Sequence, residues 1–443
     1  MARKIETIIS ELFQKEKSFN FAEEVIAQLM YQVKSKNGKL NILVAYHSDL
    51  DGCASAFGIY KMLESALTSL RVEEVDVVYK RINYNYNLEK CMGKETREAD
   101  LVFVVDYSFS TESHMRFFID NLKVDADMIW IDHHDTSIKL ETDGLLEGDP
   151  RKETVETFMN MDKLHKYLYT EKGCSGALLV TILGKLVVEG VKDIITDSEC
   201  SLRVLYLNEY KNKLNEFINN FPHIIEEVSL YDTFHPDASR EFYYAINTVE
   251  YDPQTAMENG KNVFSDVWES LLNECWDNIN EELVLNDYWN GFYINLRDSF
   301  NYEELLKKGK YILEFDKQSN MIYQRGTMFD VILKFKDKEY KAAVINAKGN
   351  SYKFEDTYYN RDCVIIFYFN NQGTYTYSIF VDENNDKIER VNAREIAEVF
   401  GGGGHTGAAG FTFNSNIFES VLQGRTPLFG DTLNGTLLEI TKA

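Results

Sequence analysis

The sequence is poor in the residues that build disulfide frameworks, flexible linkers and membrane spans. Its 443 residues include six cysteines, with no CxxC pair, and five prolines. So sparse a set of cysteines does not make a disulfide framework, and we expect free thiols in a reducing compartment. Apolar runs such as LVFVV and VIIFYF are as long as a strand and fall short of the roughly 18 residues of a membrane span. The amphipathic N-terminus, MARKIETIISELFQKEKSF, is not a signal peptide. The composition therefore predicts a cytoplasmic protein.

Positive charge is also scarce. The chain has 47 lysines and arginines against 71 acidic residues, a formal net charge of −24. A protein that binds long nucleic acid through its phosphates usually carries a basic stripe, and only local patches such as residues 305–311 are basic here. The acidity is typical of a highly soluble surface and does not suit a non-specific binder of long DNA.

The first half of the chain has the pattern of an α/β domain. Residues 1–37 carry apolar side chains at helical spacing, and from Leu40 the period changes. The runs LNILVAYH, VDVVYKRI, LVFVVDYS and MIWIDHH are short and rich in β-branched residues, and helix-like stretches separate them. Continuous apolar strands that alternate with helices predict a parallel sheet covered on both faces. Ligands of such sheets bind beyond the carboxyl ends of the strands.

The second half predicts a helical stretch followed by a smaller domain. Residues 150–235 read as mainly helical, with one helix over GCSGALLVTILGKLVVEG and another over LRVLYLNEYKNKLNEFI. After residue 310 five runs favour strands: YILEF, DVILKF, EYKAAVIN, CVIIFYF and TYTYSIFV. We expect an N-terminal helical segment (1–37), a catalytic domain (38–253), a helical connector (254–309) and a smaller α/β substrate-binding domain (310–443).

Acidic and histidine residues follow the predicted strands. They are HSDLDG at 47–52, with its helix beginning at Gly52, then Asp106, and the triplet DHH at 132–134. Two carboxylates about 4 Å apart repel by roughly 4 kcal/mol at an effective dielectric constant near 20, so a cluster of them requires protons or cations. Mixed carboxylate and imidazole donors suit Mn²⁺, and a pair of ions needs a shared ligand, for which Asp106 is the natural choice.

Each of these pieces is weak by itself. Aspartate and glycine are common in turns, strands often end in aspartate, and a histidine pair is more often structural than catalytic. Three such strand ends in succession within one sheet are hard to produce by turn chemistry alone. Their coincidence favours a metal site.

Four segments, HSDLDG, VVDYS, IDHHDT and LYDTF, resemble in order the motifs of the DHH phosphoesterases. GGGGHTGAAGF resembles the signature of the DHH-associated C-terminal domain, so the resemblance extends over about residues 38–415. The superfamily includes RecJ-type exonucleases, hydrolases of short oligonucleotides and cyclic-dinucleotide phosphodiesterases. The resemblance implies a hydrolase that uses two Mn²⁺ ions, with Mg²⁺ as the alternative.

The resemblance also implies roles for individual residues. His134 is expected to contact the scissile phosphate or to support the site, and Asp132 to orient a neighbouring imidazole. His47 stays open as a ligand, because some branches place a ligand histidine four residues before the first aspartate, where this chain has Ala45. The expected metal ligands are Asp49, Asp51, Asp106 as the bridge, His133 and Asp232.

The glycine-rich loop has two interpretations. A bare GGGG is most often a flexible turn, whereas consecutive glycines can also turn several backbone N–H groups toward one anion. The resemblance favours the second interpretation and assigns the nucleotide to Gly402, Gly403, Gly404 and His405. Many relatives have a basic residue after this histidine, and here it is Thr406, so Arg394 is expected to supply phosphate contact.

The leading hypothesis is a phosphodiesterase of short oligonucleotides or of linear or cyclic dinucleotides, which a cleft between the two domains would hold at both ends. A RecJ-like 5′→3′ single-strand exonuclease is the alternative. A non-catalytic scaffold is the third hypothesis, and the complete set of motif residues disfavours it. No membrane partner is expected, and small relatives suggest a homodimer.

Overall fold

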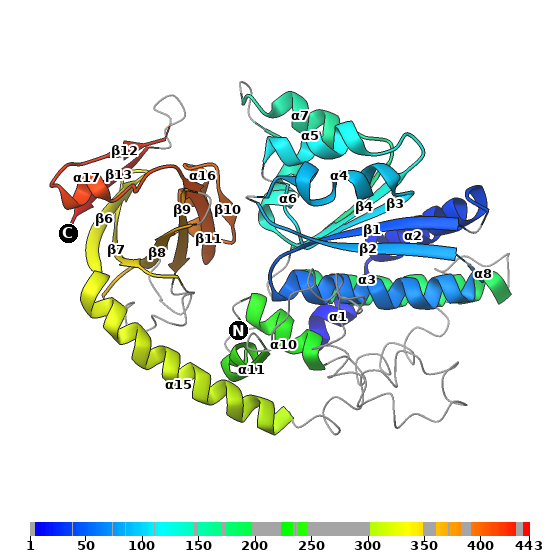
Figure 1. Cartoon of the computed structure of the whole chain (residues 1–443), viewed down its shortest axis with the longest axis horizontal. Helices are drawn as coiled ribbons and strands as arrows, with labels where there is room; N and C mark the ends of the chain where they lie inside the picture. The colour runs from blue at the N-terminus through cyan, green and yellow to red at the C-terminus, as the bar shows by residue number, and fades with distance from the viewer. Residues whose placement is uncertain are drawn as a thin grey trace. The chain divides into compact units, whose positions relative to one another are not determined.

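The computed structural model divides the chain into two compact units, residues 1–310 and 311–443, which we describe one at a time (Figure 1). The structure describes residues 5–37, 39–72, 74–84, 86–109, 111–145, 149–170, 174–196, 223–233, 235, 238–246, 302–348, 360–370, 373–381, 391–430 and 437–443. The predicted helix over residues 202–218 and the connector up to residue 301 lie outside these ranges. Among the described helices, none is long and apolar enough to cross a membrane.

The first unit is built on a five-stranded sheet in the order β2-β1-β3-β4-β5, and every neighbouring pair is parallel. Chain order reverses at β1, which has β2 on one side and β3 on the other. This switch point opens the carboxyl edge between β1 and β3 to a ligand. The strands are β1 (Lys39–His47), β2 (Glu74–Ile82), β3 (Leu101–Val105), β4 (Asp127–Asp132) and β5 (Leu164–Leu168).

Helices cover both faces of this sheet (Figure 1). Along β1, Ile42 and Val44 pack with the helices of one face, and Leu43 and Ala45 pack with those of the other. This alternation explains why the strand is apolar at nearly every position. The first face has α1 (Ile5–Gln14), α2 (Glu16–Ser35), α3 (Leu50–Ser69) and α8 (Gly176–Thr196), and the second has α4 (Leu88–Glu98), α5 (Glu112–Asn121) and α7 (Lys152–Met159).

Two assignments along the chain were wrong. Residues 164–168, within the stretch expected to be mainly helical, form the edge strand β5, because LHKYL pairs with β4 over all five residues. The run YILEF, expected to be a strand, lies inside helix α15 (Tyr302–Thr327). There Tyr311 and Phe315 are spaced by one helical turn and are 62% and 69% exposed, so these aromatic side chains cover no sheet. The first unit also contains the helices α6 (Asp135–Thr142), α10 (His223–Asp232) and α11 (Arg240–Ile246).

The second unit contains an eight-stranded curled sheet in the order β10-β11-β9-β8-β7-β6-β13-β12, antiparallel except between β7 and β8. The four other predicted runs are its central strands, and α16 (Ala393–Glu398) and α17 (Glu419–Leu422) accompany it. The predicted fold class, a parallel α/β domain with a second, smaller domain, is confirmed. The strands are β6 (Phe329–Phe335), β7 (Lys338–Asn346), β8 (Cys363–Phe369), β9 (Tyr375–Val381), β10 (Gly403–Gly404), β11 (Ala408–Phe413), β12 (Leu428–Phe429) and β13 (Leu438–Lys442).

Candidate metal centre

The turn from β1 into α3 holds the first carboxylate. Asp49 is the N-cap of α3, and its Oδ1 accepts the Gly52 N–H at 2.9 Å, while its Oδ2 lies 2.6 Å from His47 Nδ1. Burial by itself would raise the pKa of Asp49, but the charge and hydrogen bond of His47, helped by the Gly52 N–H, lower it. Glycine is required at position 52, where a Cβ would stand 2.2 Å from the His47 carbonyl oxygen.

The helix begins earlier than the sequence suggested, at Leu50 and not at Gly52. Asp51 therefore lies in the first turn of α3, and it is only 2% exposed. Its Oδ2 accepts the Gly176 N–H at 2.7 Å and its Oδ1 accepts the Ala177 N–H at 3.0 Å. Burial and the charge of Asp49 raise the pKa of Asp51, and the neighbouring charge of His133 and the Ala177 N–H work against that rise.

Asp106 stands directly after β3 at the switch point of the sheet and is 1% exposed. Its backbone has φ of +51°, a left-handed conformation that costs energy for a residue other than glycine and is typical of functional sites. Its N–H donates to the Ile131 carbonyl, and neither of its carboxylate oxygens accepts a hydrogen bond from the part of the chain that the structure describes. Burial and the charges of Asp51 and Asp49 raise the pKa of Asp106 well above its usual range.

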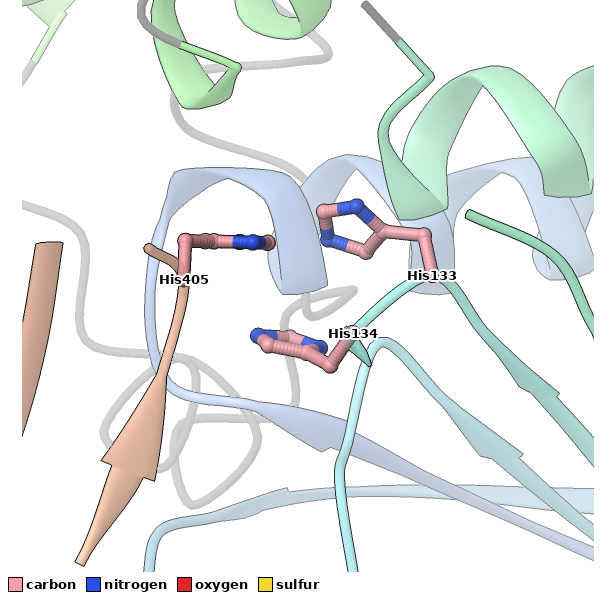
Figure 2. A group of neighbouring side chains, drawn as sticks. All are labelled: His133, His134 and His405. Atoms are coloured by element: carbon pink, nitrogen blue, oxygen red, sulfur yellow. The ribbon is translucent and has the colours of Figure 1, made fainter. Parts of the chain in front are cut away.

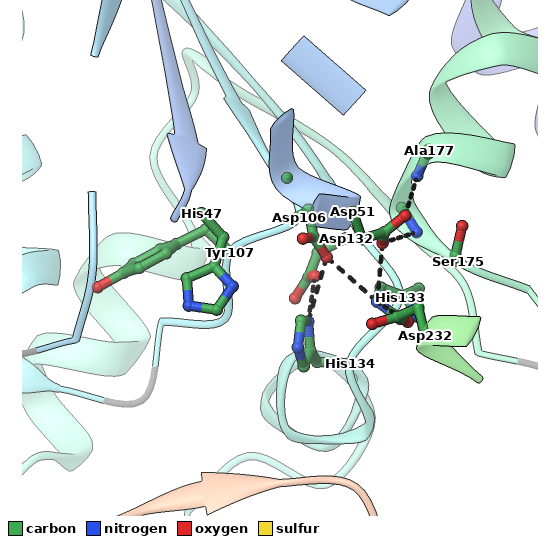
Figure 3. Close-up of polar contacts among 12 residues, drawn as sticks. His47, Asp51, Asp106, Tyr107, Asp132, His133, His134, Ser175, Ala177 and Asp232 are labelled. Atoms are coloured by element: carbon green, nitrogen blue, oxygen red, sulfur yellow. Dashed lines mark hydrogen bonds and ion pairs between the residues drawn. The ribbon is translucent and has the colours of Figure 1, made fainter. Parts of the chain in front are cut away.

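His133 is the hub of the cluster (Figure 3). Its Nε2 lies 3.1 Å from Asp106 Oδ1 and 3.5 Å from both Asp51 Oδ2 and Asp232 Oδ2. Asp232 is the last residue of α10, so a helix distant in sequence delivers the fourth carboxylate to the sheet edge. Burial and the charges of Asp51 and Asp49 raise the pKa of Asp232 well above its usual range.

His134 leaves β4 beside His133, with its ring turned differently (Figure 2). Its Nδ1 lies 2.7 Å from Asp132 Oδ1, and the Ser137 hydroxyl donates to the other oxygen of Asp132. Burial would lower the pKa of His134, but the charge and hydrogen bond of Asp132 raise it, and the same pair lowers the pKa of Asp132 to about 2. Asp132 therefore orients the imidazole of His134.

The donor atoms fit divalent cations. Within the described residues of the first unit, three sets each place one ligand atom per residue within 4.8 Å of one another, and Asp106 belongs to all three. Asp106, a buried carboxylate with no hydrogen-bond donor in the described part of the chain and with carboxylates and imidazoles around it, has the chemistry of a ligand shared between two ions. The sets are Asp51, Asp106 and His133; His47, Asp49 and Asp106; and Asp106, Asp132 and His134.

The glycine-rich loop of the second unit is partly a tight hairpin, in which β10 pairs with β11. A Cβ at Gly402 would lie 2.2 Å from the Gly410 carbonyl oxygen, and one at Gly404 would lie 2.7 Å from the Ala408 carbonyl oxygen. These two glycines therefore have a packing role besides any role in binding. Gly403 is paired with Gly410 in the same hairpin.

The two polar residues expected near that loop have identified partners. The backbone N–H of His405, whose side chain Figure 2 draws, donates to the Ala408 carbonyl at 2.7 Å. Arg394, on α16, is 6% exposed, and its Nε lies 3.7 Å from Glu398 Oε1. The His405 N–H is therefore engaged within the hairpin, and an anion at this loop would use the His405 ring in its place.

Sequence reasoning missed Ser175 and Gly176. The helix predicted over GCSGALLVTILGKLVVEG begins at Gly176, and Ser175 precedes it with its Oγ accepting the Leu178 N–H at 3.3 Å. A serine directly before an apolar helical run is the usual N-cap signal, so the boundary could have been found. The contact of these residues with Asp51 had no signal in the sequence.

Residues 41–183 match the family model described as "DHH family, N-terminal domain". Among solved structures, the chain is similar to RecJ from Thermus thermophilus with Mn²⁺, with 14% identity, a TM-score of 0.40 and coverage of 89% of this chain and 52% of that one. It is also similar to an exonuclease RecJ bound to manganese, with 12% identity, a TM-score of 0.38 and coverage of 88% of this chain and 90% of that one. A third similar structure is the pGpG-specific phosphodiesterase PggH from Vibrio cholerae, with 12% identity, a TM-score of 0.29 and coverage of 85% of this chain and 92% of that one. The chain thus spans about half the length of the Thermus protein. No curated protein matched in the sequence comparison.

Proposed function

We propose that this chain, a metal-dependent phosphoesterase whose residues 41–183 belong to the DHH family, hydrolyses short oligonucleotides or linear or cyclic dinucleotides to mononucleotides. The observation that carries the proposal is the buried Asp106 carboxylate, which three donor sets share and which accepts no hydrogen bond from the described residues. The net charge of −24 supports a small substrate over a long polyanion, which would gain little from so acidic a protein.

Two divalent cations, proposed as Mn²⁺ with Mg²⁺ as the alternative, would supply Lewis-acid polarisation of the phosphodiester. The protein's part is to hold the carboxylates at the sheet edge. Asp106 would be the shared ligand, and its left-handed backbone is the kind of strained conformation that functional sites retain. The remaining ligands would be Asp49, Asp51, His133 and Asp232, with His47 beside Asp49 as a further donor.

His134 is proposed to donate a hydrogen bond to the scissile phosphate. Asp132 holds the ring through Nδ1 and raises the pKa of His134, which favours the charged, donating form of the imidazole. A donor that is already oriented needs no rearrangement as negative charge develops on the phosphate. The glycine-rich loop, Gly402–Gly404 with His405 and the nearby Arg394, is proposed to bind the other end of the nucleotide.

The test is a hydrolysis assay of the full chain with Mn²⁺. Its substrates are dinucleotides, cyclic dinucleotides, 3′-phosphoadenosine 5′-phosphate and a series of 5′-labelled single strands from two to about thirty nucleotides long. We expect the specificity constant to be highest for the shortest substrates and to vanish with a chelator. Substrate length matters because binding of long strands relies on many phosphate contacts, which an acidic chain does not favour.

A single-strand 5′→3′ exonuclease is the second candidate. The HxDxDG spacing, which is that of RecJ-like branches, favours it, and this spacing places His47 in contact with Asp49. Rates that rise steadily from dimers to the longest strands would establish that candidate in place of the first. If Mn²⁺ binds but no member of the panel is hydrolysed, the assignment as a nucleotide phosphodiesterase is wrong.

A further inference from the structure

We propose that the N-terminus of α8 is a positioning element of the metal centre, in which Ser175, Gly176 and Ala177 fix the orientation of Asp51. Gly176 must lack a side chain because it fills the space between Asp51 and Asp106. This inference rests on the proposed function only in requiring that the centre binds a divalent cation.

Two backbone N–H groups of α8, with Ser175 directly before the helix, contact the Asp51 carboxylate. The Gly176 and Ala177 N–H groups donate to different oxygens of the carboxylate, at 2.7 and 3.0 Å (Figure 3). The Ser175 hydroxyl also interacts with this carboxylate. These N–H groups belong to the first turn of the helix and have no partner within it. Each carboxylate oxygen keeps a second lone pair for a cation, so the helix sets the direction in which Asp51 presents it.

Ser175 couples this arrangement to the helix itself. Its side chain is fully buried, and its Oγ accepts the Leu178 N–H at 3.3 Å, the bond of an N-cap. A hydroxyl that accepts from the helix can still donate its single proton, and here the acceptor is Asp51. The start of α8 and the orientation of the ligand are therefore parts of one hydrogen-bonded unit.

Gly176 has a steric role. A Cβ at this position would lie 2.8 Å from Asp106 Cβ and 3.0 Å from both Asp106 Oδ1 and Asp51 Oδ2. The first contact is closer than real Cβ atoms make, the other two are tighter than most, and the atoms in the way belong to two predicted ligands. An alanine would therefore displace one or both carboxylates by a few tenths of an ångström or more, and ligand geometry tolerates such errors poorly.

Close packing between α3 and α8 keeps the donors in place. Gly58 of α3 would place a Cβ 2.8 Å from Val180 Cγ1, so the two helices meet without an intervening side chain. Further along α8, Gly184 faces Met62, and a Cβ there would make a contact at 3.4 Å, close to ordinary packing. Gly184→Ala is thus a control that makes the same substitution in the same helix far from the ligands.

The experiment measures Mn²⁺ binding to the full chain by calorimetry, the melting temperature in a chelator and the kinetic constants for a dinucleotide. Gly176→Ala should weaken Mn²⁺ binding by about 10–100-fold, as the loss of groups that orient a ligand typically does. Gly184→Ala should leave Mn²⁺ binding unchanged. Wild-type Mn²⁺ affinity in a folded Gly176→Ala variant would overturn the inference.

A second pair of variants distinguishes the loss of the N-cap from the loss of the contact that orients Asp51. These variants test the proposal even if Gly176→Ala does not fold. Glycine is nearly as good an N-cap as serine, whereas alanine costs about 1 kcal/mol of stability. Ser175→Gly and Ser175→Ala both remove the donor to Asp51. Positioning predicts that both lose about 10-fold in Mn²⁺ affinity, although only Ser175→Ala melts earlier in the chelator. Mn²⁺ affinity that follows the melting temperature instead would show a purely structural role.

The calorimetric readout separates this inference from the proposed function. A wild-type chain that binds Mn²⁺ and hydrolyses no nucleotide contradicts the proposed substrate, and the four variants still test the role of α8. A wild-type chain that binds no divalent cation overturns the inference together with the metal centre.

Discussion

Replacing Asp106 by asparagine should raise the stability of the metal-free protein and lower the stability of the Mn²⁺-loaded protein. Asparagine keeps the shape of the side chain and tolerates the left-handed backbone at φ +51°, so it removes the charge without adding strain. In the metal-free chain that charge is harmful, since burial and the charges of Asp51 and Asp49 already raise the pKa of Asp106. In the loaded chain the same charge would be shared by both ions.

The magnitude follows from the spacing. Charges within 4.8 Å of one another, as the ligand atoms of Asp51 and Asp106 are, repel by at least about 3.5 kcal/mol at an effective dielectric constant of 20. Protonation relieves part of this repulsion, so we expect Asp106→Asn to gain about 1–2 kcal/mol of metal-free stability, or roughly 2–8 °C in melting temperature. With Mn²⁺ at a hundredfold excess over its dissociation constant, the wild type gains about 2.7 kcal/mol and the variant little.

Melting curves of both proteins in a chelator and in Mn²⁺ measure this reversal, and the dinucleotide assay accompanies them. A loss of about 4 kcal/mol of transition-state stabilisation lowers the specificity constant by roughly a thousandfold. Asp120→Asn, on the exposed side of α5, makes the same charge change away from the site and should change neither quantity. An Asp106→Asn variant that is less stable than the wild type in the chelator, or that keeps its full Mn²⁺-induced shift, would refute the shared-ligand assignment.

Three further predictions concern pH and packing. The Mn²⁺-induced rise in melting temperature should grow between about pH 5 and pH 8. Burial raises the pKa of Asp106 and Asp232, so the folded metal-free chain keeps protons that the unfolded chain releases above about pH 4. The metal-free fold therefore loses stability as pH rises. A shift that is the same at every pH contradicts this linkage. Burial would lower the pKa of His165, but hydrogen bonds to Asp127 and Glu24 raise it. His165 should therefore stabilise the fold fully below about pH 6.5 and lose that effect as pH rises through its folded pKa. The stability difference between wild type and His165→Gln, from denaturant melts, should therefore be larger at pH 6 than at pH 9, and an unchanged difference would exclude the linkage. Gly402→Ala should destabilise the second unit by about 1–3 kcal/mol, because its Cβ would meet the Gly410 carbonyl at 2.2 Å, while Mn²⁺ affinity in calorimetry stays at the wild-type value.

Much of the first unit was readable because its central strands are buried on both faces. Apolar residues at nearly every position of β1, β3 and β4, with helical runs between them, leave few alternatives to a parallel sheet. The family, too, was recognisable from the short motifs, and the match over residues 41–183 confirms it for that part of the chain. The edge strand β5 was missed because five residues of mixed polarity carry no clear period.

The opposite error occurred at the start of the second unit. The run YILEF has the composition of a strand, but the neighbouring turns of α15 continue the helix through it. The composition of five residues does not show whether the residues before and after them continue a helix through the run. The helical residues on either side of the run therefore decided its secondary structure.

Sequence alone determined which chemical groups gather at the carboxyl edge of the sheet. Strands that run parallel bring their ends to one side, so Asp49, Asp106 and His133 had to meet once the strands were identified. It could not determine what surrounds them. Asp232 arrives on α10 and Gly176 lies 125 residues from its acceptor Asp51, and no local pattern encodes such contacts. Only the tertiary structure brought the N-terminus of α8 to Asp51 and left the carboxylate of Asp106 without a donor among the described residues, because packing between distant helices sets those positions.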